Sequence, residues 1–136
     1  MNTVEDCKVV DLGIVHNDSG NITVLENQIN IPFNVERVYY LYDIPMDSTR
    51  GGHAHYELEQ YVIAVSGSFT FVLDDGKNRK EVFLNHPNKA LHIVSGIWRE
   101  IKDFSSGAVC LVLASQKYSE KDYIRSFNEF LILRNI

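Results

Sequence analysis

Apolar and polar residues alternate along most of the chain, in short runs of β-branched and aromatic residues that Gly, Asn, Asp and Pro separate. Alternation with a period of two is typical of half-buried strands, and turn signals about every 8 to 12 residues are typical of an all-β sandwich or barrel. The pattern predicts strands at residues 9–15, 22–26, 35–44, 59–65, 68–73, 80–84, 90–94, 97–103 and 109–115. Asp74-Asp75-Gly76 predicts a turn between two of them, because glycine tolerates positive φ.

The pattern changes towards the C-terminal end. The apolar residues there recur at the spacing of one helix face; they are Tyr123, Ile124, Phe127, Phe130 and Leu131. Ser119 precedes Glu120 and Asp122, as an N-cap precedes an acidic first turn. We therefore expect a short C-terminal helix that begins near Ser119, ends near Arg134 and covers the barrel or a partner subunit.

Length and composition limit the classes of function. A chain of 136 residues with 45% hydrophobic and 23% charged residues suits a single domain, 1–136, with one core. The apolar runs are only as long as strands, so we expect no membrane-spanning segment. The first residues show no basic region followed by an apolar one, which makes the cytoplasm the expected location. The net charge of −5 and the scattering of the 13 basic residues disfavour a partner made of nucleic acid.

The residues with the most distinctive chemistry are His53 and His55, which follow Arg50-Gly51-Gly52. In an extended strand, residues i and i+2 share a face and lie about 7 Å apart along the backbone, so two imidazoles would face one cavity. Histidine titrates near neutrality and can take a proton from one atom and return it to another. We therefore interpret His53 and His55 as a catalytic pair.

The spacing His53-x-His55-x4-Gln60-x6-Gly67 resembles the first motif of the cupin superfamily, small β-barrels whose side chains at these positions usually hold a metal ion. Here Gln60 replaces the acidic ligand, and Arg99 stands where the second cupin motif supplies another histidine. Arginine stays protonated and cannot donate a lone pair to a metal. We therefore predict no metal and no cofactor, although Glu59 could supply an acidic ligand if the strand were regular.

A set of short segments, spread in order over the chain, carries a more specific signal than the histidine pair. They are Arg37-Val38-Tyr39-Tyr40, Arg50-Gly51-Gly52-His53-Ala54-His55, Leu58-Glu59-Gln60, Gly67-Ser68, Leu73-Asp74-Asp75-Gly76, Ile97-Trp98-Arg99-Glu100, Asp103-Phe104-Ser105, residues 111–115, Tyr118 and Asp122-Tyr123-Ile124-Arg125. Together they resemble the TDP-4-oxo-6-deoxy-D-glucose 3,4-ketoisomerases. The resemblance implies a metal-free cupin, or jelly-roll, barrel. It also implies a homodimer with exchanged N-terminal strands and a role in making 3-amino-3,6-dideoxyhexoses for bacterial surface glycans.

The resemblance also implies a substrate, a dTDP-linked 4-oxo-6-deoxyhexose, and a histidine-mediated enediol mechanism. By match to the family, His53 is the base that acts on carbon and His55 moves a proton between the oxygens. In that family a histidine at the Arg99 position goes with the galacto product, so Arg99 favours the gluco product.

Other residues are candidates for substrate binding. Guanidinium groups bind phosphate oxygens in bidentate fashion, so Arg37 and Arg50 could hold the diphosphate, or each could form a surface salt bridge. Tyr39 could donate its hydroxyl to the sugar or pack in the core, and Trp98 could stack on thymine or sugar or likewise pack in the core. Gln60 keeps the metal-ligand position polar and can hydrogen-bond a hydroxyl group.

Three other functions remain open at this point. A sugar-nucleotide epimerase of cupin fold would normally use a longer chain and other motifs. A metal-dependent cupin enzyme would contain bound iron, manganese or zinc. A non-catalytic module that binds a sugar nucleotide would be stabilised by the ligand without exchanging the C3 proton of the sugar.

Overall fold

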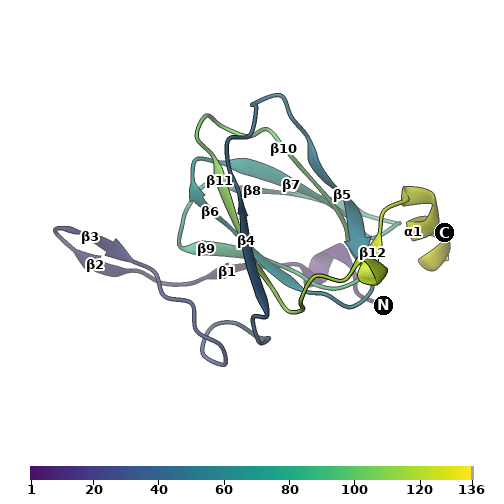
Figure 1. The fold of residues 1–136 in the computed structure, drawn as a ribbon, viewed down its shortest axis with the longest axis horizontal. Helices are drawn as coiled ribbons and strands as arrows, with labels where there is room; N and C mark the ends of the chain where they lie inside the picture. Colours follow the sequence, from purple (N-terminus) through teal and green to yellow (C-terminus); the bar gives the residue numbers. More distant parts are fainter. Residues whose placement is uncertain (136) are drawn as a thin grey trace.

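The computed structural model describes residues 1–135, which form two five-stranded antiparallel sheets that face each other and a separate two-stranded arm (Figure 1). One sheet has the order β1 (Val9–Asp11), β9 (Lys89–Ile93), β6 (Gln60–Ser66), β11 (Val109–Ala114) and β4 (Arg37–Leu41). The other has the order β12 (Tyr123–Ile124), β5 (Arg50–His55), β10 (Trp98–Lys102), β7 (Phe69–Asp74) and β8 (Arg79–Leu84). This is the expected all-β jelly-roll barrel with one short C-terminal helix.

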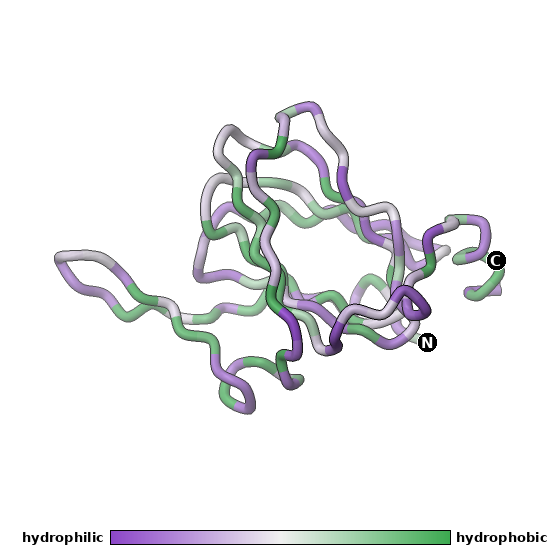
Figure 2. The backbone as a smooth tube through the Cα atoms, in the orientation of Figure 1, coloured by the Kyte–Doolittle hydropathy of each residue, from purple (hydrophilic) through white to green (hydrophobic). Residues whose placement is uncertain are grey.

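The hydrophobic core lies between the two sheets, where alternate side chains of each strand point inward. Phe69, Leu84 and Leu91 are almost fully buried there, and a 3-10 helix, η1 (Val4–Asp6), adds the buried side chain of Val4. Burying a large apolar side chain stabilises a fold by roughly 1.5–3 kcal/mol, so these contacts hold the two sheets together. Figure 2 shows the hydrophobic stretches following the strands of the barrel.

The predicted strand 9–15 is divided in two. β1 ends at Asp11, whose carboxylate accepts a hydrogen bond from the N–H of Gly13, and Gly13 has a φ of +80° that a strand does not allow. The chain then leaves the barrel and forms an arm from β2 (Val15–Asn17) and β3 (Gly20–Ile22). The predicted strand 22–26 is wrong except at its first residue, since β3 ends at Ile22.

The predicted start of the C-terminal helix is also wrong. Residues Glu120–Asp122 form a short 3-10 helix, η2, and the following strand β12 pairs with β5, which would otherwise be an edge strand. The helix α1 (Phe127–Leu133) begins only after Ser126, whose side chain caps it by accepting from the N–H of Glu129. Among residues 1–135, no helix is long and apolar enough to cross a membrane.

Candidate active site

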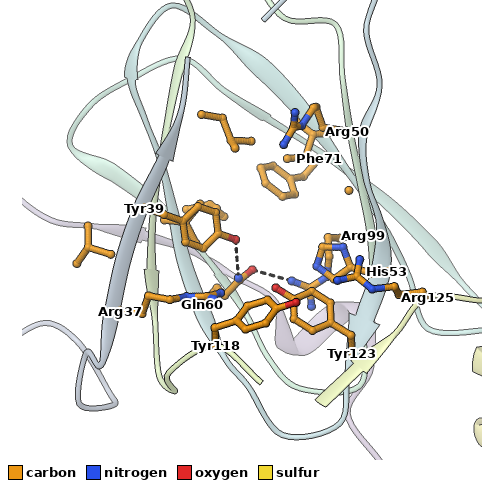
Figure 3. A pocket seen from close by; sticks show the side chains of 16 residues that line it. Arg37, Tyr39, Arg50, His53, Gln60, Phe71, Arg99, Tyr118, Tyr123 and Arg125 are labelled. Carbon is orange, nitrogen blue, oxygen red and sulfur yellow. Dashed lines mark hydrogen bonds between the residues drawn. The ribbon is translucent and has the colours of Figure 1, made fainter. Parts of the chain in front are cut away.

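A cavity of about 420 Å³ lies between the two sheets (Figure 3). Its apolar lining comes from the barrel strands and includes Val62, Phe71 and Ile101. Its polar lining is Arg37, Tyr39, Arg50, His53, Gln60, Arg99, Tyr118, Tyr123 and Arg125. The cavity is thus rich in cationic and hydroxyl groups, and none of the side chains that line it is a carboxylate.

Strand β5 reaches the cavity through an irregular start. Gly51 and Gly52 both have positive φ, +88° and +75°, which glycine adopts without strain. A Cβ atom on Gly51 would lie 3.0 Å from the carbonyl oxygen of Arg99, at the point where the register between β5 and β10 shifts. The two glycines therefore let β5 run close to β10 and bring His53 opposite Arg99.

The histidine pair lies on one face of β5, as its spacing predicts. The two ring centroids are 4.9 Å apart and the rings meet edge to face. His53 lines the cavity, and the His55 side chain is fully buried beside it. The ring of Tyr123 packs against both, with centroids 5.1 Å from His53 and 4.4 Å from His55.

Both imidazoles are neutral at pH 7. Burial, followed by the positive charge of Arg99, lowers the pKa of His53 to about 3 and that of His55 to about 2. A neutral imidazole has one nitrogen with a free lone pair, so each ring can accept a proton. The site therefore contains two adjacent potential bases, held unprotonated by their surroundings.

Arg99, Gln60 and Tyr39 form a hydrogen-bonded chain across the cavity (Figure 3). The Arg99 side chain is buried and donates to the Gln60 Oε1 atom at 2.7 Å and to the carbonyl oxygen of Ile97. Gln60 Nε2 then donates to the Tyr39 hydroxyl oxygen at 3.1 Å. Since that oxygen already accepts a hydrogen bond, the Tyr39 O–H is free to donate to another group.

Comparisons with known proteins identify the fold and the family. Residues 5–135 match the family model described as FdtA: WxcM-like, C-terminal. The chain is 40% identical, over 90% of its length and 88% of the relative's, to a TDP-4-oxo-6-deoxy-alpha-D-glucose-3,4-oxoisomerase from Aneurinibacillus thermoaerophilus. It belongs to the sugar 3,4-ketoisomerase family.

Solved structures of this family superpose closely on the chain. A 3,4-ketoisomerase from Helicobacter canadensis is 46% identical, with a TM-score of 0.93 over 96% of this chain and 98% of that chain. A sugar 3,4-ketoisomerase from Thermoanaerobacterium thermosaccharolyticum in complex with TDP is 35% identical, with a TM-score of 0.95 over 98% of this chain and 97% of that chain. A mutant of that enzyme was solved in complex with TDP-4-keto-6-deoxyglucose.

The structure of this ketoisomerase-family chain gathers most of the predicted binding residues at the cavity. Arg37, Tyr39, Arg50, Gln60 and Arg99 all line it. In Figure 3, Arg37, Tyr39 and Gln60 lie on one side, while His53 and Arg99 lie on the other.

Trp98 does not line the cavity, because it precedes Arg99 on β10 and adjacent side chains of a strand point to opposite faces. Its ring packs instead on Phe127 and Phe130 of α1, with centroids 5.2 and 5.8 Å away. Of the two roles that the sequence left open for Trp98, the structure shows the packing role, against the C-terminal helix. Contact between Trp98 and the substrate stays a prediction.

Glu59 also lies away from the histidine pair. Its carboxylate is hydrogen-bonded to the His92 ring at 2.8 Å. Among residues 1–135, no three His, Cys, Asp or Glu side chains converge as metal ligands. The absence of a metal from the protein remains a prediction.

The sequence pattern predicted the wrong secondary structure for the segment from Tyr118 to Arg125, which is part of the site. It lies along the cavity, where Tyr118, Tyr123 and Arg125 contribute to the lining. Arg125 stacks on the Tyr123 ring at 4.2 Å and pairs with Glu120. The aromatic and apolar spacing favoured a helix, but the strongest available signal was the family-like run Asp122-Tyr123-Ile124-Arg125.

Proposed function

We propose that this protein converts TDP-4-oxo-6-deoxy-D-glucose into a TDP-3-oxo-6-deoxyhexose, working as one domain over residues 1–136. The observation that carries the proposal is the pair of neutral histidines, with ring centroids 4.9 Å apart, at the wall of a cavity large enough for a sugar. Its membership in a family whose relatives are named as TDP-sugar 3,4-ketoisomerases supports the same substrate class.

The reaction moves a carbonyl group from C4 to C3 without net oxidation. The carbonyl at C4 acidifies the C3–H bond, and His53 takes that proton while the electron pair forms a C3=C4 double bond and the C4 carbonyl becomes an enediolate oxygen. His55 moves the O3 proton to O4. The C3 carbonyl then forms as C4 takes a proton from solvent, and the protonated His53 releases the C3 proton to solvent.

The low pKa values of the ligand-free histidines fit this cycle when the charge of the substrate is included. The TDP-sugar brings a negatively charged diphosphate, and the enediolate adds charge at the reacting carbons. Nearby negative charge favours the imidazolium form and raises the pKa of His53 from its value of about 3. The base thus gains proton affinity when substrate is bound.

Substrate binding follows from the cationic and hydroxyl lining of the cavity. Arg37 and Arg50 hold the diphosphate, since each guanidinium presents a fork of N–H donors. Tyr39 directs its free O–H to a sugar oxygen, and the Gln60 amide holds the tyrosine in place.

Arg99 bears on the stereochemistry of the product. Its pKa is lowered by burial but stays near 10, so it remains charged at neutral pH and is a poor proton donor to C4. The gluco product carries its C4 hydrogen on the face of the ring opposite the C3 hydrogen that His53 removes. We therefore assign protonation of C4 to solvent on that opposite face, which gives the gluco product. A fixed, buried cation here also repels a divalent metal ion, which supports a reaction without metal or cofactor.

The arm supports a homodimer with exchanged N-terminal strands. β2 and β3 pair only with each other among the described residues and project away from the barrel (Figure 1). Val15 and Ile22 are both more than half exposed, and such apolar surface is typical of an interface. Light scattering should give twice the monomer mass, and replacing both residues by Asp should reduce it.

In the cell, we place the protein in the cytoplasm, where its 3-oxo product would be the substrate for an amino transfer at C3. The resulting 3-amino-3,6-dideoxyhexose would then enter a surface glycan.

The direct test is incubation with TDP-4-oxo-6-deoxyglucose in deuterium oxide, followed by NMR. We expect the carbonyl carbon signal to move from C4 to C3 and the product to carry deuterium at C4, while the remaining substrate gains deuterium at C3. No deuterium incorporation despite thermal stabilisation by the ligand would favour a binding module. An axial C4 hydroxyl in the product would contradict the role of Arg99.

A further inference from the structure

The segment around η2 places a carboxylate against the deeper histidine. Asp122 Oδ2 lies 3.2 Å from the Nδ1 atom of His55, and the two side chains are 12% and 0% exposed. Asp122 is far from His55 in the sequence and reaches it only because β12 pairs with β5, which sets Tyr123 opposite His55. This contact is not part of the cavity lining described above.

Asp122 is held tightly in this place. Its carbonyl oxygen accepts from the N–H of Tyr56, its Oδ1 from that of Glu57 and its Oδ2 from that of Leu58, at 3.0, 3.0 and 3.1 Å. Three successive N–H groups that follow His55 thus bind one residue. Each carboxylate oxygen has two lone pairs, so Oδ2 keeps one for His55.

His55 has a buried ring whose two nitrogens both lack a hydrogen-bond partner within the described chain. Buried polar atoms are rarely left unpaired, and at functional sites the missing partner is often supplied on binding. The Asp122 carboxylate can only accept a hydrogen bond, so it favours a proton on Nδ1. Nε2, on the other side of the ring, then carries the lone pair.

We propose that Asp122 is a positioning residue that holds His55 in its Nδ1–H tautomer, so that Nε2 is the atom that moves the proton between O3 and O4 of the sugar. This rests on the proposed function. The 3.2 Å that separates Nδ1 from Oδ2 is within the reach of a hydrogen bond. Asp122 does not line the cavity, so its effect on the reaction passes through His55.

The first test is the tautomer of His55 in the wild-type protein with ¹⁵N-labelled histidine, read from long-range ¹H–¹⁵N correlation spectra near pH 7. We expect a protonated Nδ1 and an unprotonated Nε2. A protonated Nε2 would overturn the proposal. This measurement needs no variant and no turnover, so it stands apart from the test of ketoisomerase activity.

The second test uses Asp122→Asn. An asparagine has only one side-chain oxygen, so its NH₂ group must face either a backbone N–H that now donates to the carboxylate or the Nδ1 atom of His55. We expect kcat to fall about 10²-fold, with KM changed less than threefold and the His55 tautomer changed. In a His55→Asn background the same substitution should lower kcat less than about twofold, because Asp122 acts only through His55. An equal loss in both backgrounds, or an unchanged tautomer, would show a purely structural role.

The matched control is Asp75→Asn. Asp75 is also a buried carboxylate that accepts backbone hydrogen bonds, from Val4, Lys77 and Asn78, but it contacts no histidine. We expect this variant to lose stability while keeping the His55 tautomer and a kcat within about threefold of the wild type. If the wild type itself fails to isomerise the sugar, the proposed function fails. The measured tautomer of His55 still shows whether Asp122 holds the proton on Nδ1.

Discussion

Two regions of the barrel interior are buried to the same extent but made of opposite chemistry. In the apolar region, Phe69 is 0% exposed and Leu84 is 2% exposed. In the polar region, His55 is 0%, Arg99 2% and Gln60 3% exposed. Both regions lie between the same two sheets.

The difference shows what burial does in each place. In the apolar region burial itself supplies stability, since no polar group loses water. In the polar region burial costs stability: it lowers the pKa of Arg99 to about 10, and it leaves both ring nitrogens of His55 without a hydrogen bond. The apolar region thus stabilises the fold that holds the reactive groups. Four substitutions test this division, from the largest expected effect to the smallest.

His53→Asn should remove activity and leave the fold intact. We expect kcat to fall about 10³-fold, because a general base contributes about 10²- to 10⁴-fold, while the melting temperature stays the same or rises. Exchange of the C3 proton with deuterium oxide, followed by NMR, measures the loss. His92→Asn, on a histidine paired with Glu59 outside the cavity, is the control and should keep its activity. Full exchange in the His53 variant would contradict its role as the carbon base.

Leu84→Ala should have the reverse effect. Removing a buried leucine side chain destabilises proteins by about 2–5 kcal/mol, so the free energy of unfolding in urea should fall by that amount. Leu84 does not line the cavity, so kcat measured well below the melting temperature should stay within about twofold. A large loss of kcat in the folded protein would mean that the two regions are not separate.

The pH dependence of stability should reveal the buried histidines. The pKa of His55 is about 2 in the folded protein against an ordinary 6.5, so below pH 6.5 the unfolded chain binds a proton that the folded chain does not. Stability therefore falls as the pH drops from 6.5 towards 2. Between pH 7.5 and 5.0, the wild type should lose about 2 kcal/mol more than His55→Asn. Equal losses, measured by urea unfolding, would show that His55 is not held neutral.

Arg99→Met should change stability only slightly. Burial lowers the pKa of Arg99 from 12.5 to about 10, which corresponds to about 3 kcal/mol of cost to the charged form. Methionine removes that cost and also removes the hydrogen bonds to Gln60 and Ile97. We expect the free energy of unfolding to stay within about 1 kcal/mol of the wild type, since the two effects offset each other. A loss above about 2 kcal/mol would make Arg99 a stabilising residue.

Much of the barrel could be predicted from the sequence. Seven of the predicted strands, from 35–44 to 109–115, overlap β4 and β6 to β11, because a period of two requires one buried face. The strand β5 was not among the predicted strands, because Gly51 and Gly52 interrupt its pattern. The other errors lie where the local pattern competes with a tertiary contact: Gly13 turns the chain out of the barrel, and the helical spacing of Tyr123 and Ile124 yields to pairing with β5.

The site, too, was predicted in part from the sequence. The i, i+2 spacing of His53 and His55 was enough to place both imidazoles on one side of a strand, because side-chain direction in a strand depends only on parity. Parity alone did not tell which face of β10 turned inward, so Trp98 and Arg99 could not both be assigned correctly.

The sequence by itself therefore determined the strand periodicity, the shared face of the two histidines and the family. The tertiary structure alone decided which residues from distant parts of the chain meet them: Arg99 from β10, Tyr123 from β12 and Asp122 from η2. The physical reason is the distance along the chain over which each effect acts. Propensity and periodicity act over a few residues, whereas the charge, burial and hydrogen bonding that set the chemistry of an imidazole come from whatever the closed barrel packs around it.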